Sequence, residues 1–349
     1  MIVVGLDPHK KTHTAMAVDQ AGRPVGELTF PARTKGFERL LSWARELDER
    51  RLFAVEDCRH VSSSFERFLV GHGEQGVRVP PKLMAGARES ARTAGKSDPI
   101  DALAVARAAL REPDLPRIGL EGAELDLRLL VDHREDLVAQ RTAVEQRLRW
   151  HLHDLDPALE VPARRLGVAA QLQRVDRKLA RMPKTTRARI ARRLVSQCKL
   201  LSAEIDALEN EIAAIVRGLA PELLAIPGCG SLTAAKLVGE IGDVRRFSSD
   251  AKLALHAGVA PLPASSGNSS RYRLNRKGNR QLNVALHRIA ITQARIHDPA
   301  RTYLARKQAE GKTHREALRC LKRFIAREIY NTLTKRHLNA NTGLTAAVA

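Results

Sequence analysis

One stretch of the sequence repeats its apolar residues at a spacing that only a long, packed helix satisfies. Between positions 194 and 219 these residues alternate four and three apart, at Leu194, Cys198, Leu201, Ile205, Leu208, Ile212, Ile215 and Leu219. This is the seam of a coiled coil. A second stripe upstream places Leu130, Leu137 and Val144 one heptad apart, and it is interrupted at Pro157 and Pro162. The two stripes predict an antiparallel helical hairpin, which could also serve as a dimer arm.

The segment between the two stripes is strongly basic. Residues 164–199 contain twelve lysines and arginines but a single acidic residue, Asp176. A charged stretch is often only a solvated helix face, but such a face usually carries compensating acids. Their near absence favours phosphate binding. We therefore predict that the tip of the hairpin binds nucleic acid, through residues that include Arg164, Arg165, Arg174, Arg177 and Lys178.

The charge of the whole chain indicates the same class of partner. The 59 lysines and arginines exceed the 39 aspartates and glutamates, and the formal net charge of +20 implies a polyanion such as nucleic acid. Aromatic residues make up only 3%, which argues against base stacking as the main mode of recognition. The four cysteines are widely spaced, as in a reducing compartment, and no run approaches the roughly 20 apolar residues of a membrane span. We expect a cytoplasmic protein with no signal peptide and no membrane partner.

The first part of the chain predicts a mixed α/β sheet. Strands are expected at residues 2–6, 12–18, 25–30, 52–55 and 76–79, and helices at residues 37–47, around 65–69 and from 96 to about 111. The first three strands follow one another as hairpins, whereas the later strands alternate with helices. This order is typical of an α/β domain rather than of an all-β fold.

Four acids fall at informative places in that domain. Asp7 and Glu56 each end a predicted strand, where open α/β sheets place their sites. Asp98 and Asp101 are three apart on one helix and share a face. If the four carboxylates converge, Mg²⁺ or Mn²⁺ would hold them together, and two ions roughly 4 Å apart could clamp a phosphoryl transfer. Alternatively, Asp98 as an N-cap, Pro99 as the first helical residue and Asp101 in the first turn would explain the second pair by helix capping alone.

Two further segments carry candidate phosphate contacts. Residues 227–230 (Pro-Gly-Cys-Gly) precede an alanine-rich helix, which predicts a phosphate grip of the helix-hairpin-helix kind or, equally, a plain glycine turn. Residues 258–280 combine small hydroxyl residues and glycine with a basic run, and they predict a mobile loop beside a phosphate clamp. That arrangement suits a serine nucleophile. A solvated serine-rich loop before a basic helix is the alternative. The basic residues are Arg271, Arg273, Arg276, Lys277 and Arg280.

Taken in order, these pieces resemble one family over essentially the whole chain, the DEDD-type insertion-sequence transposases, which are bridge-RNA-guided recombinases. The matching segments are GLDPHK (5–10), Glu56, KSDPIDA (96–102), IPGCGSLTAAKLVGEIGDVRRF (226–247), HAGVAPLPASSG (256–267) and RKGNRQL (276–282). The resemblance implies an α/β domain at residues 1–122 that looks like a ribonuclease H-class Holliday-junction resolvase. It further implies a coiled-coil arm at residues 123–219 and a mainly helical transposase domain at residues 220–349.

The resemblance also implies roles and partners. Asp7, Glu56, Asp98 and Asp101 would be the metal-binding DEDD tetrad, and Ser266 the nucleophile. Donor and target DNA would pair with a structured non-coding guide RNA. A homo-oligomer, dimer to tetramer, would join the acids of one subunit to the serine of another. Two other functions fit the residues: a metal-dependent junction-resolving endonuclease that uses water, and a non-catalytic binding protein whose acids are caps.

Overall fold

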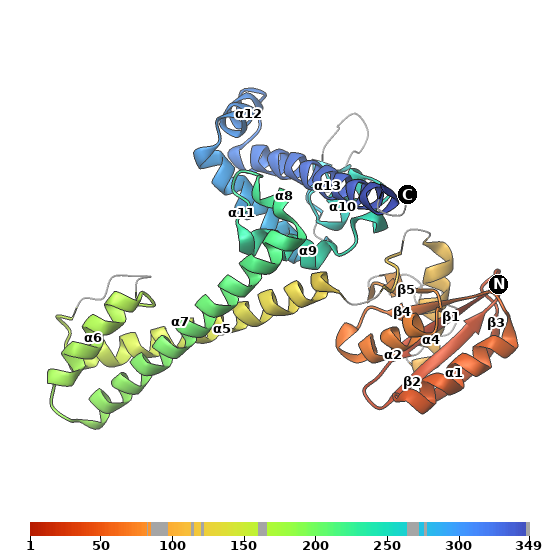
Figure 1. Ribbon diagram of the computed structural model, residues 1–349, viewed down its shortest axis with the longest axis horizontal. Helices are drawn as coiled ribbons and strands as arrows, with labels where there is room; N and C mark the ends of the chain where they lie inside the picture. The colour runs from red at the N-terminus through yellow and green to blue at the C-terminus, as the bar shows by residue number, and fades with distance from the viewer. Residues whose placement is uncertain are drawn as a thin grey trace. The chain divides into compact units, whose positions relative to one another are not determined.

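The computed structural model describes residues 1–81, 83–84, 97–112, 115–119, 122–159, 166–263, 272–275 and 278–346. The chain forms two compact units (Figure 1). Unit 1 is Met1–Glu121 with Arg245–Ser248, and unit 2 is Gly122–Val244 with Ser249–Ala349. No described helix is both long and apolar enough to cross a membrane. Each unit is described below by itself.

Unit 1 is built on a five-stranded mixed sheet in the order β3-β2-β1-β4-β5. The strands are β1 (Ile2–Pro8), β2 (Thr12–Val18), β3 (Pro24–Pro31), β4 (Arg51–Glu56) and β5 (Gly76–Val79). The first three strands pair antiparallel, and β4 and β5 then add in parallel beside β1. The predicted hairpin series followed by alternating strands and helices is therefore confirmed, with each strand within two residues of its predicted bounds.

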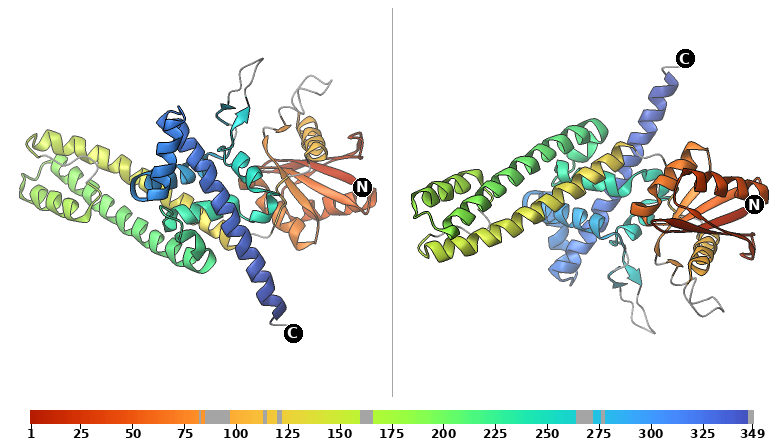
Figure 2. Two further views of the ribbon diagram at one scale, coloured as in Figure 1. Left: turned by 90° about the horizontal axis from the view of Figure 1, so that it is seen from above. Right: turned by 90° about the horizontal axis from the view of Figure 1, so that it is seen from below.

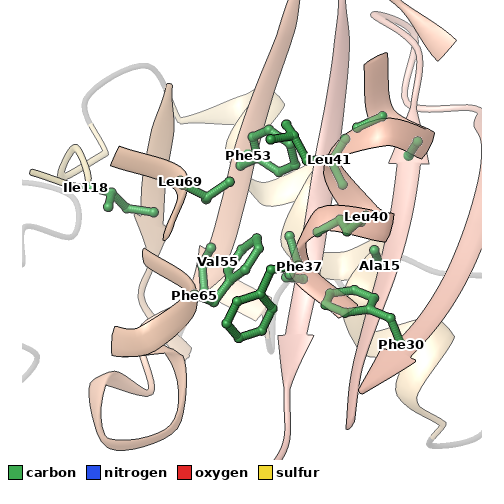
Figure 3. Close-up of a cluster of buried hydrophobic side chains, with 14 of the residues drawn as sticks. Ala15, Phe30, Phe37, Leu40, Leu41, Phe53, Val55, Phe65, Leu69 and Ile118 are labelled. Carbon is green, nitrogen blue, oxygen red and sulfur yellow. The ribbon is translucent and has the colours of Figure 1, made fainter. Parts of the chain in front are cut away.

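Three helices cover the two faces of this sheet. α1 (Thr34–Leu47) and α2 (Arg59–Gly71) close one face over a core rich in phenylalanine (Figure 3). Rings of Phe37 and Phe65 meet edge to face with centroids 5.2 Å apart, a favourable aromatic geometry. α4 (Asp98–Arg111) packs on the other face, where its alanines lie against β1. Aromatic residues are scarce in the sequence, and unit 1 uses several of them to fill this one core.

Gly5 brings α4 unusually close to β1. A Cβ at this position would stand 2.3 Å from the carbonyl oxygen of Ala102 and 2.4 Å from the backbone nitrogen of Ala106. Only a residue without a side chain allows that approach. The contact fixes the height at which the first turn of α4 lies above the end of β1, and that turn carries two of the predicted acids.

The arm of unit 2 is a helical hairpin with a third helix at its tip. α5 (Ala123–Leu155) and α7 (Thr186–Leu219) run antiparallel, side by side in both views of Figure 2. Cys198, Leu201, Ile205 and Ile212 of the predicted seam are buried. α6 (Ala169–Arg181), which the sequence analysis did not predict, packs Leu172, Val175 and Leu179 into the same core. The predicted hairpin is thus confirmed, and its tip is a helix rather than a simple connection.

The rest of unit 2 is mainly helical. It includes α8 (Pro221–Leu224), α9 (Ser231–Ile241), α10 (Asp250–His256), β6 (Leu262–Pro263), β7 (Tyr272–Arg273), α11 (Arg280–Ile296), α12 (Asp298–Ala309) and α13 (His314–Ala346), and the short η1 (Val244–Arg246) falls at the boundary between the two units. α13 packs against α10, α11 and α12. The fold class is therefore α/β in unit 1 and mainly helical in unit 2.

The arm is joined tightly to α9. A Cβ at Gly239 would stand 3.0 Å from the Cα of Arg128, so the backbones of α9 and α5 touch. The buried amine of Lys236 reaches Glu135 at 2.5 Å. A buried cation without its partner is costly, so this ion pair holds the two helices in one relative position.

Candidate active site

Two of the predicted acids end neighbouring parallel strands. β1 and β4 pair in register up to Leu6 opposite Val55, and the next residues on each strand are Asp7 and Glu56. Residues that face one another across a parallel ladder point to the same side of the sheet. Asp7 is 5% exposed, while Glu56 is partly exposed. The strand ends therefore present one buried and one accessible carboxylate.

The other two acids lie in the first turn of α4. The backbone N–H of Asp101 donates to the carbonyl of Ser97 at 3.0 Å, so the helix begins after Ser97, which is the N-cap residue. The capping alternative placed Asp98 at that position, and this is corrected by one residue: Asp98 is the first residue of the helix. Its side chain is 56% exposed, and Asp101 is buried at 6% exposure. Asp98 is therefore not the cap, but both acids lie in the first turn of α4, where the alternative placed Asp101 and where negative charge is favoured.

The electrostatics of Asp7 indicate that the four acids converge. Burial raises the pKa of Asp7 to about 6, and the nearby charges of Glu56, Asp101 and Asp98 act in the same direction, while His9 opposes them. Carboxylates within reach of one another disfavour each other's ionised form. Asp7 therefore lies within electrostatic reach of the other three predicted acids, and we call these four residues the acid cluster.

His9 joins this cluster, although the sequence analysis gave it no role. Its Nδ1 lies 3.7 Å from Oδ2 of Asp7, and its Nε2 lies 4.0 Å from Oδ1 of Asp98. One ligand atom each from Asp7, His9 and Asp98 lies within 4.8 Å of the others. The backbone N–H of His9 donates to Nδ1 of the buried His13 at 3.2 Å, which fixes the turn after β1. The signal available in the sequence was a histidine two residues after the strand-ending aspartate.

Three of the five predicted nucleic-acid contacts of the arm lie on α6. Arg174 and Arg177 are exposed, and Lys178 is partly exposed. The single acid of this segment, Asp176, is already bound by Lys199 at 2.6 Å and lies 3.8 Å from Arg192. Within the described residues, no ion pair involves Arg174 or Arg177. Arg164 and Arg165 lie outside the described residues.

The serine segment is only partly described. Ser265, Ser266, Arg271, Arg276 and Lys277 lie outside the described residues, whereas Arg273 is in β7 and Arg280 begins α11. β6 and β7 pair antiparallel on either side of that segment, with Leu262 opposite Arg273. The serines therefore belong to the connection of a two-stranded ribbon.

Three asparagines bind the backbone of the segment that precedes β6. We call this segment, residues 255–260, the ribbon root. The side-chain amide of Asn275 donates to the carbonyl of Leu255 at 2.9 Å, and that of Asn283 donates to the carbonyl of Ala257 at 3.0 Å. The backbone N–H of Asn279 donates to the carbonyl of His256 at 2.6 Å. Asn283 lies in α11 and Asn279 is its N-cap residue, so two of these contacts fix the ribbon root against the start of α11, while Asn275 adds a contact from the segment before it. The sequence analysis missed the asparagines because such bonds join positions far apart in the chain.

The predicted glycine turn before α9 is present. Gly228 has a positive φ of 82°, and Gly230 is the N-cap residue of α9. The side-chain amide of Gln293 donates to the carbonyl of Pro227 at 2.9 Å, so the turn is fixed on α11. Phosphate binding by this turn stays a prediction.

Comparison with known proteins identifies the class of protein to which this chain belongs. A DEDD family model named after IS110 and described as "Transposase" matches residues 4–157, and one described as "Transposase IS116/IS110/IS902 family" matches residues 220–305. The chain is 30% identical to the "Insertion element IS116 uncharacterized 44.8 kDa protein" of Streptomyces clavuligerus, over 92% of each chain. It is also 30% identical to the "Insertion element IS110 uncharacterized 43.6 kDa protein" of Streptomyces coelicolor, over 91% of this chain and 90% of the relative.

A more distant relative carries an explicit description. The "Transposase for insertion sequence element IS1111A" of Coxiella burnetii is 25% identical over 66% of this chain. These matches define the class: the protein is a transposase, an enzyme that acts on DNA. Within that class the chain belongs to the IS116/IS110/IS902 family of insertion-sequence transposases. The predicted membership in the DEDD-type insertion-sequence transposases is thereby confirmed.

Proposed function

We propose that this transposase cuts and rejoins DNA strands by phosphoryl transfer, with the acid cluster as its divalent-metal site. The observation that carries the proposal is the convergence of Asp7, Glu56, Asp98 and Asp101 at the end of one sheet. The strand order of unit 1 supports a resolvase-like domain of the ribonuclease H class, because it places acids at the ends of adjacent parallel strands under a helix that carries two more.

The donor set suits Mg²⁺ or Mn²⁺. Carboxylate oxygens are hard ligands that these ions prefer, and an imidazole such as that of His9 is tolerated better by Mn²⁺ than by Mg²⁺. Asp7, Asp98 and His9 would hold the ion, with Asp101 and Glu56 beside them. A bound divalent cation would supply positive charge that stabilises the oxyanions developing on the phosphate. Unless cations are present, burial disfavours the ionised form of Asp7 and the neighbouring carboxylates add to this effect, so that its pKa is raised.

Ser266 is the nucleophile in this proposal. Its Oγ forms a bond to the DNA phosphorus and loses its proton, while one phosphorus–oxygen bond to deoxyribose breaks and the leaving oxygen takes up a proton. A later attack by a strand hydroxyl on the serine phosphodiester reverses the step and rejoins DNA. The support is that Ser266 lies in the sequence between β6 and β7, which pair with one another, and that three asparagines fix residues 255–260 just before β6.

The proposal includes the assembly and the guide. Ser266 belongs to unit 2 and the acid cluster to unit 1. A homo-oligomer, dimer to tetramer, would supply the serine of one subunit to the acids of another. A structured non-coding RNA would pair with donor and target DNA, while the protein reads backbone and shape. The exposed arginines of α6 support a backbone contact of this kind.

The experiment is denaturing electrophoresis of labelled donor and target DNA after incubation with the protein, the RNA transcribed from the flanks of its gene, and Mg²⁺. Wild type should yield cleaved strands and a protein–DNA adduct. Asp7→Asn should yield neither, Ser266→Ala should yield no adduct, and Ser265→Ala should retain it. The matched control is Asp57→Asn, an acid beside Glu56 that the proposal does not use. Absence of an adduct together with metal-dependent cleavage in both serine variants would favour the junction-resolving endonuclease.

A further inference from the structure

A pocket of about 330 Å³ lies between α11 and α13 in unit 2, outside every segment discussed above. Its wall on α13 carries His314, Arg315, Arg319 and Lys322, and His287 projects from α11. No lining residue is acidic among those that the structure describes. On α13 the arginines are four residues apart and Lys322 is three further on, so the three cations share one helix face. The pocket, which we call the cationic pocket, is therefore a concentration of like charge.

The burial of Lys322 among these like charges is energetically unfavourable. Its side chain is 8% exposed, and its amine donates to the neutral Oδ1 of Asn283 at 2.9 Å. Burial and the neighbouring Arg319 lower the pKa of Lys322, and burial and Lys322 in turn lower the pKa of His287. A buried charge is stabilised by a partner of opposite sign, and none is paired with Lys322 among the described residues.

The nearest acid along the helix is engaged elsewhere. Glu316 follows Arg315 directly, but its Oε2 accepts from the backbone N–H of Thr313 at 2.9 Å and from its hydroxyl at 2.8 Å. Glu316 therefore completes the N-terminal cap of α13 and does not line the pocket. The cations of the pocket are left to face an anion from outside.

The pocket is also apolar in part. Leu318 is buried and Ile291 is exposed at 41%, and both belong to its lining. A volume near 300 Å³ is at the lower end for a small-ligand site, which is large enough for more than an isolated phosphate. Aliphatic side chains beside cations suit a ligand that joins a phosphate to a less polar body.

We propose that the cationic pocket binds one nucleotide unit of a nucleic-acid strand, with the phosphate held by Arg315, Arg319 and Lys322 and the sugar and base against Ile291 and Leu318. This inference rests on the proposed function only in taking the strand from the DNA or RNA of the transposition reaction. Either nucleic acid offers the same phosphodiester, and the experiment distinguishes them.

A hydrogen-bond chain connects the pocket to the ribbon root. Lys322 donates to Asn283, and Asn283 donates to the carbonyl of Ala257 at 3.0 Å and to that of Gly258 at 3.2 Å. Residues 257 and 258 lie shortly before β6, which begins at Leu262. The same asparagine therefore contacts both the buried cation of the pocket and the ribbon root, and we assign the pocket a role in positioning the substrate strand.

The test measures binding of the full-length protein to fluorescent strands of one sequence, made as single-stranded DNA, duplex DNA and RNA, over a series of salt concentrations. Arg315→Gln combined with Arg319→Gln should weaken binding ~10-fold near physiological salt. The slope of log affinity against log salt should fall by roughly two, because two arginines no longer neutralise phosphates. Both side chains are exposed, so the fold should be retained, as thermal denaturation would verify. The control, Arg295→Gln combined with Lys335→Gln, removes the same charge from exposed positions outside the pocket.

A photocrosslinking residue at Ile291 identifies the strand. Crosslinks to DNA or to RNA should form in wild-type background and disappear when Arg315 and Arg319 are replaced. Equal salt slopes for pocket and control variants, or crosslinks that survive the arginine replacements, would overturn the proposal. Asp7→Asn should leave binding and crosslinking intact. If neither wild type nor any variant cleaved DNA, but the arginine replacements still weakened binding and crosslinking, the proposed function would be wrong and the proposed role of the pocket would be retained.

Discussion

The acid cluster of unit 1 and the cationic pocket of unit 2 are built on the same principle with opposite sign. Each gathers like charges and buries at least one of them beside its neighbours of the same sign: Asp7 is the buried member in one, and Lys322 in the other. They differ in what fixes them. The acids lie on strand ends and a helix held close together at Gly5, whereas the pocket is tied through Asn283 to a ribbon root.

That difference separates two tasks of a DNA-cutting enzyme. A cation site works when its ligands are rigid before the ion arrives, and backbone packing provides this. A strand-binding site must also deliver its ligand to a nucleophile, and a hydrogen-bond chain to the ribbon root provides that connection. Variants that damage one site should therefore leave the other intact.

The largest effect is expected from Gly5→Ala. The new Cβ would meet two backbone atoms of α4 at 2.3 and 2.4 Å, and backbone cannot move aside as a side chain can. Unfolding free energy should fall by about 3 kcal/mol or more, and Mg²⁺ binding should weaken because α4 carries Asp98 and Asp101. Denaturant titration measures the unfolding free energy, and calorimetry measures Mg²⁺ binding. Gly71→Ala, where a Cβ meets nothing within 4 Å, is the control. Unchanged stability would mean that α4 does not lie so close to β1.

Asp7→Asn should stabilise the metal-free protein above pH 6. The pKa of Asp7 is raised from 3.8 to about 6 in the folded state, so the fold favours the protonated form, and stability is lost as the pH rises from about 4 to 6. Asparagine mimics the protonated acid, and the gain at pH 8 should be at most about 3 kcal/mol and vanish below pH 4. Thermal unfolding across that pH range, in a metal chelator, measures it. A variant less stable than wild type at pH 8 would contradict a repelling cluster.

Asn283→Ala removes the hydrogen bonds that connect the cationic pocket to the ribbon root. It removes the acceptor of Lys322 and the donor of two carbonyls, and this should cost about 1–3 kcal/mol of stability. Adduct formation through the serine segment should fall, while Mg²⁺ binding in unit 1 should not change. Gln281→Ala, an exposed position on the same helix, serves as the control. Loss of Mg²⁺ binding in Asn283→Ala would show that the two sites are not independent.

The smallest effect is expected from His9→Ala. Because imidazole suits Mn²⁺ better than Mg²⁺, Mn²⁺ affinity should fall about 10-fold and Mg²⁺ affinity less. Electron paramagnetic resonance measures the Mn²⁺ affinity, and calorimetry measures the Mg²⁺ affinity. Lys10→Ala, in the same turn, should change neither. Equal weakening for both ions would assign His9 to the turn rather than to the ion.

The features that could be predicted from the sequence are those that depend on the spacing of apolar residues and on where strands end. The strands of unit 1, the two long helices of the arm and the four acids follow from apolar spacing and from where carboxylates interrupt it. α6 was missed because Leu172, Val175 and Leu179 stand in so basic a segment that charge dominated its interpretation. The N-cap of α4 was displaced by one residue because Asp98 and Ser97 are both good caps.

Contacts between distant positions were beyond such reasoning. The close approach at Gly5 needs the geometry of a helix nearly one hundred residues away in the chain. The asparagine bonds to the ribbon root and the charge of the cationic pocket likewise join helices that no local pattern relates. His9 was named in a motif, yet its role depends on where Asp98 lies in space.

The tight junction of α5 and α9 fixes the distance between the tip of the arm and the other helices of unit 2. α5 has 33 residues, and the part that runs from Arg128 at that junction to Leu155 near the tip is therefore about 40 Å long. Because Gly239 and the Lys236–Glu135 pair prevent the arm from pivoting, the basic helix at the tip stays at a set distance from the helices that form the cationic pocket. A straight duplex lying along this part of the arm would cover roughly twelve base pairs. A nucleic acid held at both places at once would therefore be selected by its length, without any base being read.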